Sequence, residues 1–262
     1  MLPEDELLVV PFRYMVLLCG SFPVGGMVAC LFVVVTLHFE GATRTHCGVA
    51  NFLPSISAMI GDYTPERYIW RICIALHCLP RFTIPFIYKN YFLTSPLRDV
   101  QTLGALRHLA WLGCLVHSVE NFCLVALTYV SSTENHEFHA FAFSTFVLMA
   151  LSYMLLNIYL FHHSGRRRSS SNGEKSFQYK LLTFAVSIIA LFCSAYFYWR
   201  HNAYCEPGVY TLFALSEYTI VVSNVLFHAT CYYDFQDKKF VLVSMNSIDS
   251  LMTTSTVDWK AS

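Results

Sequence analysis

The chain has 262 residues, of which 55% are hydrophobic, 16% are aromatic and only 13% are charged. Soluble domains carry about 25% charged residues, so this composition, with a mean hydropathy of +0.47, excludes an ordinary soluble globule. Seventeen basic residues balance seventeen acidic ones, and the lack of a net positive charge argues against nucleic acid as a partner.

Six apolar stretches are long enough to cross a membrane. About 20 helical residues cover about 30 Å of hydrocarbon, and a window of that length predicts spans at residues 15–37, 68–88, 109–130, 138–161, 181–199 and 208–233. Acidic residues precede the first stretch, which is also longer than a signal peptide allows, so we interpret it as a retained helix. No strand signal outweighs these helices. We predict an all-α polytopic membrane protein: a six-transmembrane-helix bundle forming a single domain.

The positions of the basic residues predict the orientation, because Lys and Arg collect at the cytosolic ends of spans. Threading six spans places twelve of them on one side: Arg13, Lys89, Arg98, Arg107, Arg166, Arg167, Arg168, Lys175, Lys180, Lys238, Lys239 and Lys260. The other side holds only Arg44, Arg67 and Arg200. We therefore expect both termini to be cytosolic.

Two polar segments lie on the predicted cytosolic side. Residues 165–180 are Ser-rich and basic, and we interpret them as a linker between two three-helix halves. Residues 234–262 carry Ser, Thr and Asp without apolar periodicity, which predicts a disordered tail.

Of the ten cysteines, only Cys47 and Cys205 fall outside the spans, and both are predicted on the lumenal side. In an oxidising lumen they could form a disulfide. Two reduced packing thiols are the alternative, because sequence does not give the Cα separation that a bridge requires. A metal site with His46 and His201 is formally open, but no paired C-x-x-C spacing supports it, so we predict no metal.

Ionisable side chains recur at membrane depth, where each costs several kcal/mol unless it is paired or hydrated. The second span holds Arg71, His77 and Arg81, the third holds His117, Glu120 and Asn121, and the sixth holds Glu217, Asn224 and His228. Their helical spacing puts each set on one face. We predict a buried network in which Glu120 and Glu217 neutralise arginines of the second span.

That network has two interpretations. It can be a structural clasp that determines which helices meet. It can instead line a headgroup or catalytic cavity in which a histidine and a carboxylate serve together as the acid–base pair. The catalytic candidates are then His77, His117, Glu120, Glu217 and His228. No phosphate-binding Gly loop, nucleophile elbow or H-E-x-x-H motif occurs, and we predict no cofactor.

Four blocks carry a family resemblance: HFEGATRTHCGVANFLPSISAMIG (38–61), YIWRICIALHCLPRF (68–82), VENFCLVALTYVSS (119–132) and RHNAYCEPGVYTLFALSEYT (200–219). They resemble the post-GPI attachment to proteins factor 2 family, including its factor-2-like members, of the FRAG/DRAM/Sfk group. The resemblance implies a multi-pass protein of the Golgi or endoplasmic reticulum membrane. It also implies fatty-acid remodelling of glycosylphosphatidylinositol (GPI) anchors, at the step where a lyso-GPI anchor regains a saturated chain.

The implied partners are membrane lipid, lyso-GPI or GPI-anchored proteins, and a further membrane protein. Lipid-headgroup candidates are Arg71, Arg81, Arg200, His46, His201 and Asn202, with Arg71 and Arg200 as the expected phosphate partners. Two classes of function stay open: an acyltransferase, and a non-enzymatic lipid-binding or transport subunit that presents lyso-GPI to a separate enzyme. A receptor or channel is less favoured, because no repeated pore-lining element occurs.

Overall fold

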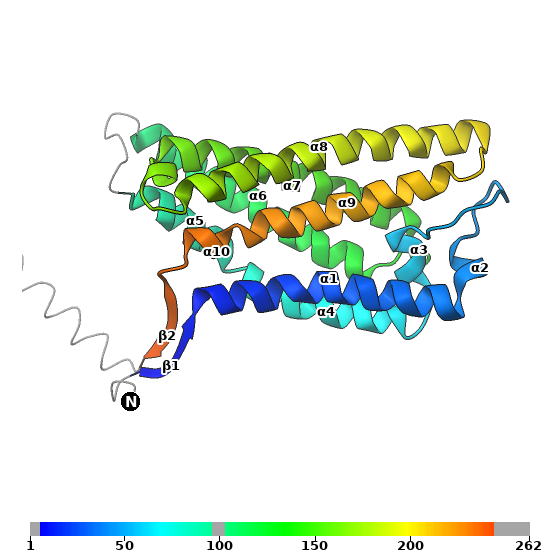
Figure 1. Ribbon diagram of the computed structural model, residues 1–262, viewed down its shortest axis with the longest axis horizontal. Coiled ribbons are helices and arrows are strands. Elements are labelled where there is room, and N and C mark those ends of the chain that lie inside the picture. The colour runs from blue at the N-terminus through cyan, green and yellow to red at the C-terminus, as the bar shows by residue number, and fades with distance from the viewer. Residues whose placement is uncertain (1–5, 96–102, 244–262) are drawn as a thin grey trace, which may run out of the picture.

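A computed structural model describes residues 6–95 and 103–243. Figure 1 shows long helices running side by side along the molecule. The long helices are α1 (Phe12–Leu37), α6 (Leu103–Tyr129), α7 (His136–His163), α8 (Gly173–Tyr204) and α9 (Val209–Ala229). The other elements are β1 (Glu6–Pro11), α2 (Phe39–Ala42), α3 (Ile56–Gly61), α4 (Glu66–Arg81), α5 (Ile84–Leu93), η1 (Arg166–Arg168), α10 (Cys231–Asp234) and β2 (Lys239–Val243). The fold is mainly helical, as the sequence predicts.

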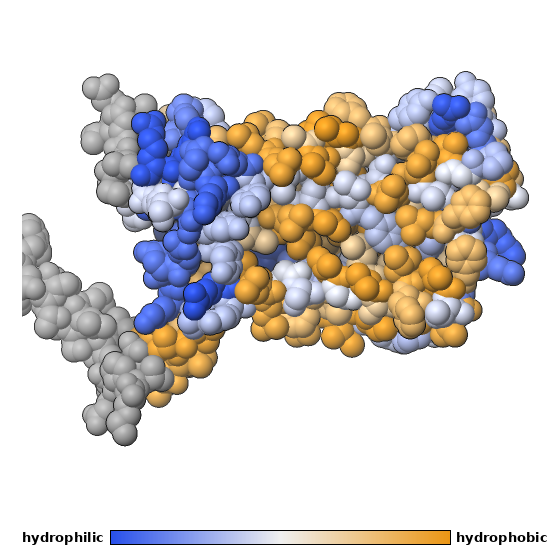
Figure 2. All heavy atoms as spheres, viewed as in Figure 1, coloured by the Kyte–Doolittle hydropathy of each residue, from blue (hydrophilic) through white to orange (hydrophobic). Residues whose placement is uncertain are grey.

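Among the described residues, five helical stretches are long and apolar enough to cross a membrane: Phe12–Leu37, Leu103–Tyr129, His136–His163, Gly173–Tyr204 and Val209–Asp234. Their outward side chains are apolar, and Phe32 and Phe192 are each 70% exposed. Figure 2 shows hydrophobic residues over the middle of the bundle and hydrophilic residues gathered towards its ends. Apolar exposure of this extent indicates contact with lipid rather than water. The chain is therefore a multi-pass membrane protein.

The second predicted span, residues 68–88, is not one helix. α4 ends at Arg81 and α5 begins at Ile84. Pro85 has no N–H to donate to the carbonyl of Arg81, so the helical hydrogen-bond pattern stops there. The side-chain amide of Asn121 donates to that carbonyl instead, at 3.2 Å. With 16 residues, α4 is shorter than one crossing requires, so six continuous spanning helices are not confirmed.

The predicted linker, residues 165–180, is partly helical. α8 begins at Gly173 and includes Lys180, which is 0% exposed. The Lys180 ammonium group donates to Asp234 Oδ2 at 2.7 Å and to the hydroxyl of Thr230 at 2.5 Å. Because Asp234 is 54 residues away in the sequence, no local pattern marks Lys180 as a buried residue.

The predicted tail also differs from the structure. Residues 239–243 form β2, which pairs antiparallel with β1, with Phe240 opposite Val10. β-branched and aromatic residues favour such a strand, but its partner lies at the other end of the chain, so the sequence gives no hairpin signal. The rest of the predicted tail, residues 244–262, lies outside the described residues, as does Arg98.

The two ends of the bundle are different. One end, here called the basic end, carries β1, α5, η1 and α10, and the opposite end, here called the loop end, carries α2, α3 and the turn between α8 and α9 (Figure 1). At the basic end, Arg166 donates to the carbonyl of Tyr91 at 2.6 Å and so connects η1 to α5.

Candidate functional site

A cluster of polar side chains lies buried in the middle of the bundle. Glu120 of α6 forms an ion pair with Arg81 of α4. The same Glu120 oxygen contacts His228 Nε2 and accepts from Asn224 Nδ2, both on α9 and both at 3.0 Å. Arg81 also contacts His77 Nε2 at 3.0 Å. We call His77, Arg81, Glu120, Asn224 and His228 the central cluster.

The central cluster contains only part of the predicted network. Arg81 and Glu120 are 5% and 0% exposed, so the ion pair joins α4 to α6 away from solvent. Among the described residues, Glu217 has no cationic partner, and its Oε2 atom has no hydrogen bond. Arg71 also lies apart from the cluster. The structure therefore brings together one of the two predicted carboxylates and one of the two predicted arginines.

His117 is adjacent to the central cluster and buried. Its ring stacks on those of Tyr153 and His228, with centroid distances of 4.1 and 4.7 Å. Neither ring nitrogen has a hydrogen-bond partner among the described residues. His117, Glu120 and His228 are close enough for their ligand atoms to surround one metal ion. However, the Arg81 guanidinium already neutralises Glu120, which makes this donor set a poor fit for a cation.

The arginines expected to contact phosphate are paired with acidic groups at the loop end. Arg71 donates to the carbonyl of Tyr129 at 2.8 Å and forms a 3.2 Å ion pair with Glu134. Hydrogen bonds from Ser131, first from its backbone N–H, lower the pKa of Glu134 below its ordinary value. Arg200 Nε lies 2.5 Å from Glu206, and this hydrogen bond lowers the pKa of the Glu206 carboxyl. Both arginines are thus partly neutralised.

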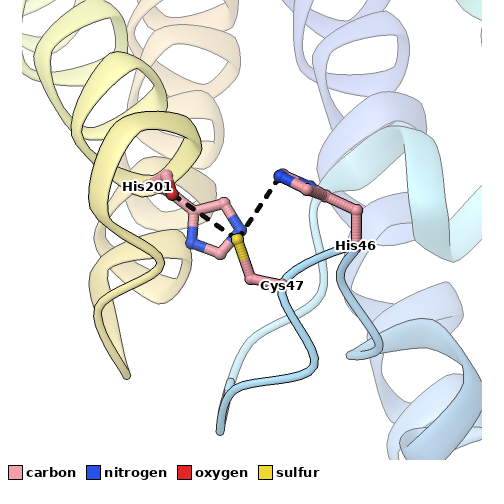
Figure 3. Close-up of side chains that lie close together, drawn as sticks. All are labelled: His46, Cys47 and His201. Carbon is pink, nitrogen blue, oxygen red and sulfur yellow. Dashed lines mark hydrogen bonds between the residues drawn. The ribbon is translucent and has the colours of Figure 1, made fainter.

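Cys47 and Cys205 are joined by a disulfide with a Cα–Cα distance of 5.4 Å. Figure 3 shows Cys47 between His46 and His201. The His201 ring is buried, and its nitrogens have no hydrogen-bond partner in the described part of the chain. A disulfide sulfur is not a thiolate, so this trio lacks the ligand that a metal would need from cysteine. Asn202, also a headgroup candidate, is exposed beside it.

The loop end contains a cavity of about 590 Å³, which we call the end cavity. Its walls come from α2, α3, α7, α8 and α9, from the loops after α2 and α3, and from the turn between α6 and α7. Polar lining residues include Arg44, Ser57, His139 and Glu217, and apolar ones include Phe143, Leu191 and Phe213. Arg71 and Arg200 are not among the residues that line it. This volume is in the range of small-molecule sites, and the mixture of walls suits an amphipathic ligand.

Ser57 and His139 form a hydrogen-bonded pair in this cavity. Ser57 Oγ lies 3.0 Å from His139 Nε2, and His139 Nδ1 lies 2.8 Å from the carbonyl oxygen of Val130. Sequence reasoning missed this pair, because its members are 82 residues apart and only the fold brings α3 against α7. His139 alone could have indicated a polar site in the sequence, because it is an ionisable residue at the start of an apolar span.

Residues of the end cavity and of the central cluster line one smaller cavity of about 50 Å³. Ser57, His139 and Glu217 line it together with His77, Arg81 and Asn224 of the central cluster. The end cavity and the central cluster are therefore neighbours along the axis of the bundle.

Comparisons with known proteins find the same family that the four sequence blocks resemble. A sequence model of the Frag1/DRAM/Sfk1/Cwh43P N-terminal domain matches residues 11–238. The chain is 48% identical to "Post-GPI attachment to proteins factor 2" of Caenorhabditis elegans, over 92% of each protein. It is 39% identical to "Acyltransferase PGAP2" of Xenopus tropicalis, over 86% of this chain and 87% of that protein. It is also 37% identical to the Drosophila melanogaster "Post-GPI attachment to proteins factor 2", over 89% of each. No solved structure matches the chain.

Proposed function

The chain belongs to the Frag1/DRAM/Sfk1/Cwh43P family, and on that premise we propose that it remodels the lipid of GPI anchors. The step is reacylation: a lyso-GPI anchor receives a saturated fatty acid during maturation of GPI-anchored proteins. Relatives that match most of the chain are named for post-GPI attachment and for acyl transfer, which supports this step.

The membrane topology belongs to the same proposal. We place the basic end in the cytosol, because Lys and Arg favour that side, and the loop end in the lumen of the Golgi or endoplasmic reticulum. α4 and α5 together make one crossing, which is the second in chain order and brings the total to six. The break at Pro85 then lies inside the membrane. Both termini are then cytosolic, and the disulfide faces an oxidising compartment.

The end cavity is the observation that carries the proposal. A GPI lipid presents a phosphate and sugar hydroxyls above its acyl chains, so its site needs a cation, hydrogen-bonding groups and apolar walls. Arg44 lines the cavity and its side chain has no hydrogen bond or ion pair among the described residues. We assign the phosphate contact to Arg44, rather than to Arg71 and Arg200, because both of those are held by carboxylates.

Substitution of Arg44 tests this assignment. Loss of one phosphate contact made by a charged group costs about 1.5–3 kcal/mol, so Arg44→Gln should raise the KM for lyso-GPI by about 10-fold or more. The matched control is Arg168→Gln, which removes an equal charge from an exposed position at the basic end. Equal KM values for the two variants would exclude Arg44 as the phosphate partner.

The function itself is tested in cells that lack their own family member. Expression of this chain should restore saturated chains to the GPI anchors, as measured by mass spectrometry of released anchors. If the GPI anchors still lack saturated chains while the protein is abundant in the Golgi, the proposed function is wrong. Transfer that requires an added partner protein in purified vesicles would instead identify the chain as a presenting subunit.

A further inference from the structure

The hydrogen bonds around His139 determine which of its nitrogens carries the proton. The carbonyl oxygen of Val130 can only accept, so His139 Nδ1 carries a hydrogen and donates it over 2.8 Å. In the neutral ring, Nε2 then has a free lone pair. The Ser57 hydroxyl, 3.0 Å away, donates to that lone pair. A serine that donates to a histidine held in one tautomer has the arrangement of a nucleophile and its base.

Local structure holds both residues in place. Asn135 caps α7 by accepting from the N–H of Phe138 at 3.0 Å, so His139 lies in the first turns of a well-defined helix. Ser55 caps α3 by accepting from the N–H of Ala58, and Ser57 follows two residues after that cap. The pair is therefore formed by two capped elements and not by a loose loop.

The pair faces a space that can hold substrate. Ser57 is half-buried and His139 is buried, and both line the end cavity. Glu217 lines the same cavity and is only 7% exposed. The backbone N–H of Ile56 contacts its carboxyl group, while Oε2 has no partner among the described residues. A buried carboxyl oxygen without a partner is suited to bind a ligand hydroxyl.

We propose that Ser57 is the acyl-accepting nucleophile of this protein, that His139 is its general base, and that Glu217 positions the hydroxyl of the acceptor lipid. This assignment rests on the proposed function. The donor is a glycerophospholipid ester, because in the proposed topology the end cavity lies at the lumenal end of the bundle. Membrane phospholipid is present at that end, whereas the membrane separates it from a soluble cytosolic thioester.

The transfer takes place in two halves. In the first, His139 Nε2 takes the proton of Ser57 as Oγ bonds to the carbonyl carbon of the donor ester. The bond from that carbon to the glycerol oxygen breaks, and His139 gives the proton to this oxygen, so that a lysophospholipid leaves. In the second, the acceptor hydroxyl gives its proton to His139 and bonds to the same carbon. The bond to Oγ then breaks and the proton returns to Ser57. One acyl group moves and nothing is oxidised.

A long-chain fluorophosphonate, which reacts with activated serines, tests the nucleophile directly on the purified protein. We expect the wild-type protein to be labelled at Ser57 and labelling of Ser57→Ala to fall at least 10-fold. The matched control is Ser118→Ala. This variant removes a hydroxyl that donates to the backbone carbonyl of Cys114 on α6, outside the end cavity. Labelling of Ser57→Ala at the wild-type level, or no labelling of active wild-type protein, would overturn the assignment.

The variant His139→Gln separates catalysis from folding. A glutamine can still donate to Val130 and accept from Ser57, so the contact between α3 and α7 is kept while the base is lost. We expect acyl transfer to fall by about 100-fold or more with unchanged abundance. His108→Gln, at an exposed histidine whose ring lies within hydrogen-bond distance of the Gly104 carbonyl, is the control. Transfer within threefold of the wild-type rate in His139→Gln would exclude the base role.

Cell rescue distinguishes the two levels of the proposal. If the wild-type protein does not restore saturated anchors, the proposed function fails whatever Ser57 does. If the wild-type protein restores them and Ser57→Ala restores them equally at equal abundance, the proposed function stands and the nucleophile assignment is wrong.

Discussion

Arg81 contacts the four other side chains of the central cluster: Glu120, His77, Asn224 and His228. A buried ion pair adds little stability compared with apolar packing, but removing one partner leaves the other charged and unpaired. We therefore expect the cluster to act as a clasp that determines how α4, α6 and α9 meet. Glu217, which has no cation beside it among the described residues, has no such role.

The two buried glutamates should respond differently to the same substitution. Glu120→Gln leaves Arg81 without its counter-charge, so we expect a loss of about 3–5 kcal/mol and low protein abundance. Glu217→Gln should change stability by about 1 kcal/mol but reduce acyl transfer. Thermal unfolding in detergent and transfer assays at equal protein amounts measure both. Normal stability of Glu120→Gln would contradict the clasp.

At the scale of elements, the break between α4 and α5 depends on an exchange of hydrogen-bond donors. Pro85 removes a backbone donor, and the Asn121 amide supplies another to the carbonyl of Arg81 at 3.2 Å. This contact connects the kink to α6, next to Glu120. The position of Arg81 in the central cluster therefore depends on the kink as well as on its ion pair.

A pair of substitutions tests that dependence. Asn121→Leu leaves the Arg81 carbonyl without a partner, which should cost about 1–3 kcal/mol. Adding Pro85→Ala restores a backbone N–H at the right position, so the double variant should regain part of the loss. Pro85→Ala alone is the control. If the two effects simply add in thermal unfolding, the carbonyl of Arg81 is not the point of contact.

The elements also show what sequence can and cannot predict. Apolar length alone predicts the long helices, because lipid requires every backbone group to be paired within a helix. The helical spacing of the polar residues and their predicted depth in the membrane also place Arg81 near Glu120, as the structure shows. The break at Pro85 was missed because a window of 20 residues averages over it. Ser57 with His139, and Lys180 with Asp234, join distant segments, so no local pattern reveals them.

At the scale of the whole molecule, the disulfide closes the loop end. It joins the segment after α2 to the end of α8, across 158 residues of sequence. Nearby, the N–H of Gly208 donates to the carbonyl of Ala50 at 2.9 Å, and that of Phe52 donates to Thr211 Oγ1 at 2.9 Å. The loop after α2, whose Arg44 lines the end cavity, is thereby held against the start of α9.

Removal of the bridge should therefore weaken the whole molecule. We expect Cys47→Ser to lower stability by about 2–4 kcal/mol, and the double variant with Cys205→Ser to be no worse than the single one. Thermal unfolding with and without reductant gives the comparison. A wild-type protein that is insensitive to reductant would show that the bridge does not hold the loop end.

Acyl transfer at Ser57 in the end cavity is the step on which the proposed function and the proposed nucleophile both depend. Its most direct measurement uses purified protein in vesicles that contain lyso-GPI and a phospholipid with a labelled saturated chain. The wild-type protein should move the label to lyso-GPI without any partner protein, and Ser57→Ala should not. Absence of transfer by folded wild-type protein would show that the protein alone is not an acyltransferase, and equal transfer by Ser57→Ala would show that Ser57 is not the nucleophile.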